Sequence, residues 1–142
     1  MSNQENSNTS MTTDSTKVTP EEIAQYREQF ADNKEALYAL DIIAATKGDL
    51  KQAANLLAPK YNVVISKKVP NILEELARKC RHTICDDLFI DELMTGLLTA
   101  AVASLTASGQ IPAAMATPVV IYLAKTGVKK WCESTKEEPK NP

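Results

Sequence analysis

Residues 45–57 read ATKGDLKQAANLL, a stretch in which one helix ends and the next begins within a few residues. Gly48 can take the left-handed backbone conformation that closes a helix, and Asp49 is a typical N-cap residue for the helix that follows. The next residues place small and aliphatic side chains on one face at helical spacing: Leu50, Ala53, Ala54 and Leu57. This stretch predicts two helices that cross at a steep angle.

Two helices are predicted in the chain before this turn. Thr19-Pro20-Glu21-Glu22 combines an N-cap residue, a proline at the first helical position and a glutamate three residues after the cap. Asp32 or Asn33 can cap the next helix, expected over about 34–46. Residues 1–18 are dominated by Ser, Thr and Asn, so they hold too little apolar surface to offset the entropy of ordering. We expect them to form a disordered tail.

The chain after residue 57 contains two contrasting parts. Residues 58–70, APKYNVVISKKVP, break the helical period, and a further helix is predicted over about 71–81. Residues 93–124 contain no charged side chain, and residues 108–112, SGQIP, divide them into two apolar arms. We expect a buried helical hairpin whose first arm, including Met94 and Leu97, is the central helix. A membrane-active hairpin is the alternative, although each arm falls short of the about 20 apolar residues that span a bilayer.

The composition agrees with a small helical protein. The chain has 142 residues, 44% of them hydrophobic but only 5% aromatic, and a net charge of −2. We therefore predict an all-α, single-domain bundle of five to six helices. The expected boundaries are a tail over 1–18, a helical domain over 19–133 and a frayed tail over 134–142. Within the domain, 19–62 form a three-helix subunit, 63–70 a connector, and 71–133 a helix followed by the apolar hairpin.

The sequence offers little support for catalysis or metal binding. Cys80, His82 and Cys85 lie close together, but their spacing is not a familiar zinc pattern and they point in different directions on a helix. Cys132 is the third cysteine, and an odd number without a secretory signal favours reduced thiols in a cytoplasmic protein. We predict no enzyme activity, no metal and no cofactor.

Residues 39–57, ALDIIAATKGDLKQAANLL, resemble the last two helices of ubiquitin-associated domains and also the first half of Fis-type helix-turn-helix domains. The first resemblance implies a protein-binding three-helix unit, and the second implies DNA binding. In the Fis-type family a recognition helix follows within a few residues, whereas here residues 58–70 intervene. Residues 111–133 weakly resemble small helical domains of bacterial, particularly cyanobacterial, signalling and conflict-system proteins, which implies an adaptor or effector-associated role.

A cluster of basic residues is the candidate contact surface for a phosphate group or a protein partner. It contains Lys60, Lys67, Lys68, Arg78, Lys79 and Arg81. We expect a non-catalytic interaction module that binds a protein partner or forms a homo-oligomer. A DNA-binding regulator that uses Lys67, Lys68, Arg78 and Arg81 is the first alternative, and a membrane-active effector is the second.

Overall fold

The computed structural model describes residues 14–63 and 71–136, which contain nine helices and no strand. The all-α prediction is confirmed, but five to six helices is wrong because short turns divide several predicted helices. The helices are α2 (Pro20–Gln29), α3 (Lys34–Ala45), α4 (Leu50–Lys60), α5 (Ile72–Lys79), α6 (Arg81–Ile84), α7 (Asp87–Met94), α8 (Leu98–Ala107), α9 (Ala113–Thr126) and α10 (Val128–Lys136).

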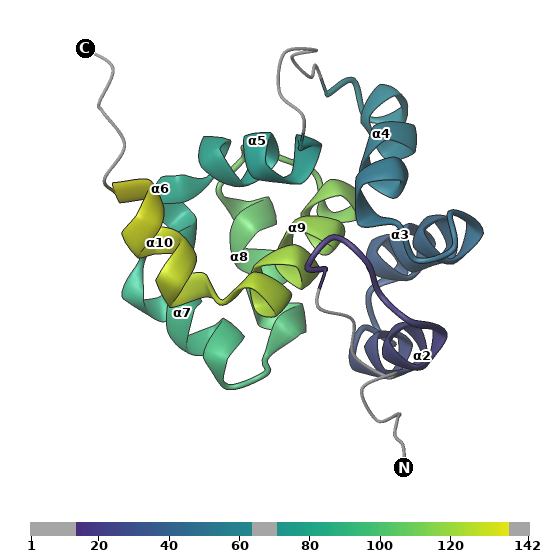
Figure 1. The fold of residues 1–142 in the computed structure, drawn as a ribbon, viewed down its shortest axis with the longest axis horizontal. Helices are drawn as coiled ribbons and strands as arrows, with labels where there is room; N and C mark the ends of the chain where they lie inside the picture. Colours follow the sequence, from purple (N-terminus) through teal and green to yellow (C-terminus); the bar gives the residue numbers. More distant parts are fainter. Residues whose placement is uncertain (1–13, 64–70, 137–142) are drawn as a thin grey trace.

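Helix α9 is the centre of the fold, and the other helices surround it (Figure 1). It packs against α3, α4, α5, α7, α8 and α10, and every residue from Ala113 to Leu123 is buried. Pro118 lies inside α9, and the Thr117 hydroxyl donates to the Ala113 carbonyl at 2.9 Å. The hairpin is therefore part of the core. Its second arm is the central helix, whereas we had predicted the first arm.

Glycine residues divide the helices that the sequence suggested were continuous. Gly96 has a φ of +81° and lies between the end of α7 and the start of α8. Met94 and Leu97 flank this break and are 59% and 56% exposed, so their predicted place in a buried stripe is wrong. Gly127, with a φ of +99°, separates α9 from α10 in the same way. Left-handed backbone is accessible to glycine without a steric penalty, which makes it a natural break point.

The first three helices begin and end close to where the sequence predicted. Thr19 and Glu22 form a capping box at the start of α2, and the Asn33 side chain caps α3. Asp49 caps α4 by accepting a hydrogen bond from the Gln52 amide at 3.0 Å. These caps satisfy backbone amides that have no partner inside the helix.

Residues 14–19 form an ordered segment, called the strap below, that crosses the turn between α3 and α4. The Val18 amide donates to the Gly48 carbonyl and the Leu50 amide donates to the Thr16 carbonyl, both at 2.9 Å. Val18 is only 5% exposed. The predicted disordered tail is therefore wrong for residues 14–18, because backbone hydrogen bonds to the turn compensate for their polar composition. Residues 1–13 lie outside the described residues.

The end of the chain is also more ordered than predicted. Helix α10 continues to Lys136, and Thr135 is buried with its hydroxyl 2.9 Å from the Trp131 carbonyl. The predicted frayed tail is therefore wrong for residues 134–136, and 137–142 lie outside the described residues.

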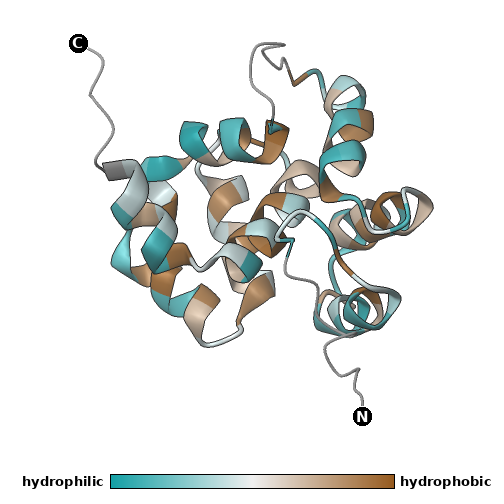
Figure 2. Cartoon of the chain, in the orientation of Figure 1, coloured by the Kyte–Doolittle hydropathy of each residue, from teal (hydrophilic) through white to brown (hydrophobic). Residues whose placement is uncertain are grey.

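Buried apolar residues of 14–63 and of 71–136 form one hydrophobic core. Figure 2 shows hydrophilic residues along outer helices such as α2 and α5. None of the helices in residues 14–63 and 71–136 has the length and apolar character needed to cross a bilayer.

Candidate functional site

An open apolar groove of about 500 Å³ lies between α2, the end of α3 and the strap. On α2 it is lined by residues at spacings of three and four, which share one face of a helix: Pro20, Ile23, Ala24 and Arg27. The strap contributes Val18, and the end of α3 and its turn contribute Ala44, Lys47 and Gly48. The groove is hollow because exposed alanines on α2 and α3 leave the space between the helices unfilled.

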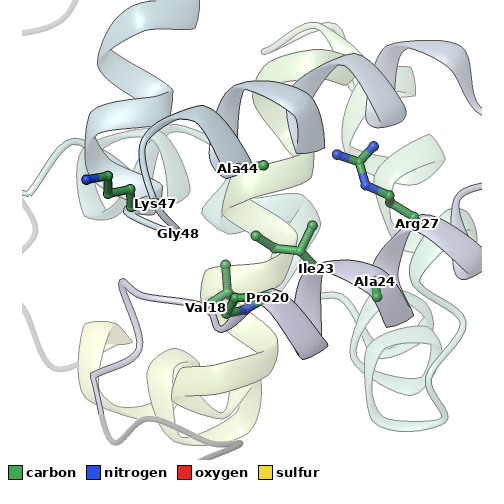
Figure 3. A pocket seen from close by; sticks show the side chains of 8 residues that line it. All are labelled: Val18, Pro20, Ile23, Ala24, Arg27, Ala44, Lys47 and Gly48. Atoms are coloured by element: carbon green, nitrogen blue, oxygen red, sulfur yellow. The ribbon is translucent and has the colours of Figure 1, made fainter.

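The side chains divide the groove into an apolar middle and two basic ends. Figure 3 shows Val18 and Ile23 between Lys47 at one end and Arg27 at the other. Both apolar side chains are almost entirely buried, at 5% and 8% exposure, and therefore form a firm floor. Of the eight residues that line the groove, two carry a positive charge and none a negative charge.

Hydrogen bonds from α8 and α9 hold both ends of α2 in place. Lys125 of α9 forms an ion pair with Glu22 at 2.7 Å, with side chains only 8% and 15% exposed. Thr99 of α8 donates to the Gln29 carbonyl at 2.8 Å, in the last turn of α2. These contacts fix α2 relative to the core, so the groove is present before any ligand binds. A preformed site lowers the ordering cost of association.

The described members of the predicted basic cluster have different surroundings. Lys67 and Lys68 lie outside the described residues. Arg78 forms an ion pair with Glu74 at 2.9 Å on α5. Lys79 lines a more polar cleft of about 570 Å³ with residues from the end of α4 and the α8–α9 loop. Lys60 is exposed in the last turn of α4, and DNA contact by these residues stays a prediction.

Arg81 has a structural position that the sequence did not suggest. Its Nε donates to the Thr135 hydroxyl at 2.9 Å, and its guanidinium also donates to the Cys132 carbonyl at 3.2 Å. Both acceptors are in α10. Arg81 therefore fastens the C-terminal helix to α6, and its guanidinium is only partly available to an external ligand.

The cysteine prediction requires correction. Cys85 and Cys132 form a disulfide with a Cα–Cα distance of 5.8 Å, so these two thiols are not reduced. Their separation of 47 residues concealed the pairing, which depends on α10 folding back against α6 and α7. Cys80 is a free, buried thiol, and burial raises its pKa to about 11. A thiol that stays protonated is a poor nucleophile.

A half-buried polar cluster centres on the Glu74 carboxylate. Tyr122 of α9 donates its hydroxyl to Glu74 at 2.9 Å, and the Trp131 indole of α10 donates at 3.1 Å. Burial, followed by the hydrogen bond to Glu74, raises the pKa of Tyr122 to about 12. The carboxylate joins three helices and its acceptor positions are used in doing so, which indicates a structural role.

Among the described residues, no group of three His, Cys, Asp or Glu side chains is positioned to hold a metal ion. The disulfide also removes Cys85 and Cys132 from any thiolate ligand set.

Comparison of the chain with protein-family models, curated proteins and solved structures finds no match. The resemblances of residues 39–57 and 111–133 therefore stay predictions.

Sequence reasoning missed the groove for a physical reason. Its walls are alanines, which have the same helical spacing whether they face a neighbour closely or leave a gap. Val18 was assigned to a disordered tail, so part of the groove floor was absent from the prediction. The one available signal was the helical spacing of Pro20, Ile23, Ala24 and Arg27, which places them on one face of α2.

Proposed function

We propose that this protein is a non-catalytic interaction module that binds a segment of a partner protein in the groove between α2 and α3. The observation that carries the proposal is an open apolar groove on a helix whose two ends are fixed to the core. Apolar walls provide the favourable burial on which most protein association depends.

Several features favour binding over catalysis at this position. The lining residues include no His, Cys, Ser, Asp or Glu side chain that could act as a nucleophile or a general base. Lys47 and Arg27 are the two ionisable residues of the lining, and each lies at one end of the open groove. An open channel between two helices suits an elongated peptide segment, as in recognition modes in which a short segment occupies a groove.

A selection experiment with the full chain tests this proposal. Immobilised protein is used to select ligands from a displayed library of random peptides, and the selected peptides are measured against two tryptophan variants. Ala24→Trp fills the groove from α2, whereas Ala103→Trp places the same side chain at an exposed position of α8. We expect Ala24→Trp to weaken peptide binding at least about tenfold, the loss of roughly 1.4 kcal/mol of binding free energy.

Ala103→Trp should leave affinity unchanged, and circular dichroism should show that both variants keep the helical fold. Equal affinity of wild type and both variants would show that the groove is not the binding site.

A further inference from the structure

The charge distribution of the groove indicates what kind of segment fits it, provided that the proposed function holds. Arg27 follows Pro20 by seven residues on α2, a distance of about 10 Å along the helix axis. Lys47 lies at the opposite end, beyond the last residue of α3. An extended chain covers about 10 Å in roughly three residues, so a short extended peptide can follow this face of α2, with a cation at each end of the groove.

The cation on α2 can exchange its present partner for a ligand. Arg27 forms an ion pair with Asp41 of α3 at 2.8 Å, with side chains 39% and 62% exposed. Such an exposed pair contributes little to stability. A ligand carboxylate can therefore engage the guanidinium, which binds carboxylates in a planar, two-pronged geometry.

The other cation is positioned by the turn at the end of α3. Lys47 has a φ of +60°, and its amide donates to the Ala44 carbonyl at 3.0 Å. The next residue, Gly48, is held by the Val18 amide of the strap. This fixed backbone places an exposed lysine at the groove end, next to apolar residues of the strap and α2.

The middle of the groove determines what lies between the two carboxylates. Its floor is Val18 and Ile23, and its sides are Ala24 and Ala44. Small walls leave room for one or two aliphatic side chains, and the apolar floor disfavours polar ones because they would lose hydrogen bonds to water.

We infer that the groove binds an extended partner segment in which aliphatic residues are flanked by two carboxylates, one meeting Arg27 and the other Lys47. Recognition combines burial of the aliphatic side chains with charge complementarity at both ends. The charges set the preference for acidic flanks and the register of the segment, because charge complementarity contributes mainly to specificity.

The peptide selection described above tests this inference through a change in specificity. Peptides selected by the wild-type protein should carry acidic residues on both sides of an aliphatic centre. Arg27→Glu combined with Lys47→Glu should bind these peptides at least about tenfold more weakly, and its own selection should favour basic flanks. A matched control, Lys129→Glu with Lys130→Glu, makes the same charge change on exposed residues of α10 and should keep the acidic preference.

A neutral variant guards against a folding defect caused by placing Glu next to Asp41. Arg27→Gln with Lys47→Gln should retain the helical circular dichroism spectrum and lose the preference for acidic flanks. If Ala24→Trp weakens peptide binding but the neutral and reversed variants bind as tightly as wild type, this inference is overturned and the proposed function stays intact. Peptides that bind Ala24→Trp as tightly as wild type would overturn both.

Discussion

The Val18 amide donates a hydrogen bond to the Gly48 carbonyl at 2.9 Å, and the Val18 carbonyl lies against the α-carbon of the same glycine. A β-carbon on Gly48 would collide with that carbonyl oxygen, and the glycine φ of +84° is also unfavourable for other residues. We predict that Gly48→Ala lowers the free energy of unfolding by the backbone strain of about 1–2 kcal/mol together with a steric cost of about 1–3 kcal/mol.

Gly96→Ala is the matched control for this change. Gly96 has nearly the same φ, +81°, but nothing lies within 4 Å of the added carbon. It should lose only the strain contribution. Urea unfolding followed by circular dichroism measures both variants, and equal losses would mean that the strap does not press on the turn.

Glu74→Ala should destabilise the contact between α5, α9 and α10. The change leaves the Tyr122 hydroxyl and the Trp131 indole, both almost fully buried, without their carboxylate acceptor. Hydrogen bonds to a charged group contribute about 1.5–3 kcal/mol, so a loss in that range is expected. Glu74→Gln keeps one oxygen acceptor and should lose less. Urea unfolding followed by the fluorescence of Trp131, the single tryptophan, measures the effect.

The control for that prediction is Glu133→Ala, which removes an exposed carboxylate from α10. Its expected change is within about 0.5 kcal/mol. If Glu74→Ala unfolds at the same urea concentration as Glu133→Ala, the cluster does not hold the helices together.

Stability should fall between pH 10 and 12. Burial and the hydrogen bond to Glu74 raise the pKa of Tyr122 to about 12, whereas an unfolded tyrosine has a pKa of about 10. In this interval the unfolded chain loses the phenol proton while the folded chain keeps it, so deprotonation favours unfolding as the pH rises. Burial also raises the pKa of Tyr26 to about 12, and that residue should act in the same direction.

Urea unfolding of wild type and Tyr122→Phe at a series of pH values from 9 to 12 isolates the contribution of Tyr122. The free energy of unfolding should fall less steeply with pH in the variant, because the Tyr122 phenol, whose pKa is raised, has been removed. Parallel curves for the two proteins would contradict the assignment.

Alkylation in denaturant should label one cysteine without a reductant and three after reduction, because only Cys80 has a free thiol. Replacing Cys85 and Cys132 together by alanine should lower the free energy of unfolding by about 4 kcal/mol, the chain-entropy value for a loop of 47 residues. Mass spectrometry measures the labelling, and urea unfolding measures the stability. Labelling of three cysteines without reductant would show that the disulfide is not formed.

Local sequence signals located the first half of the fold well. Thr19, Asn33 and Asp49 cap their helices, and the sequence could predict this because each cap accepts a hydrogen bond from the amide only three positions further along. Gly48 closes α3 for an equally local reason. These features require no knowledge of the tertiary structure, which is why the boundaries of α2, α3 and α4 were predictable.

Features that depend on distant contacts were not predictable from one sequence. Val18 is ordered because it meets a turn that lies 30 residues further along the chain. The charge of Arg81 made it a candidate ligand-binding residue, but its hydrogen bond to α10 gives it a structural role. Within the site, the sequence placed Pro20 at the start of α2 and Gly48 at the end of α3, but the groove itself was not predicted, because its sides belong to elements brought together by folding.

The Cys85–Cys132 disulfide makes a closed covalent ring of the chain between these two residues. The α8–α9 loop, with Gly109 and Gln110 exposed, lies inside this ring. A single cut there would leave both products joined and migrating as one species on a gel until a reductant is added. A cut outside the ring, between α2 and α3, would give two separate bands on the same gel without reductant. After such a cut, non-covalent contacts alone would hold the released part of the groove to the rest of the molecule. After a cut inside the ring, α10 would stay attached through the disulfide.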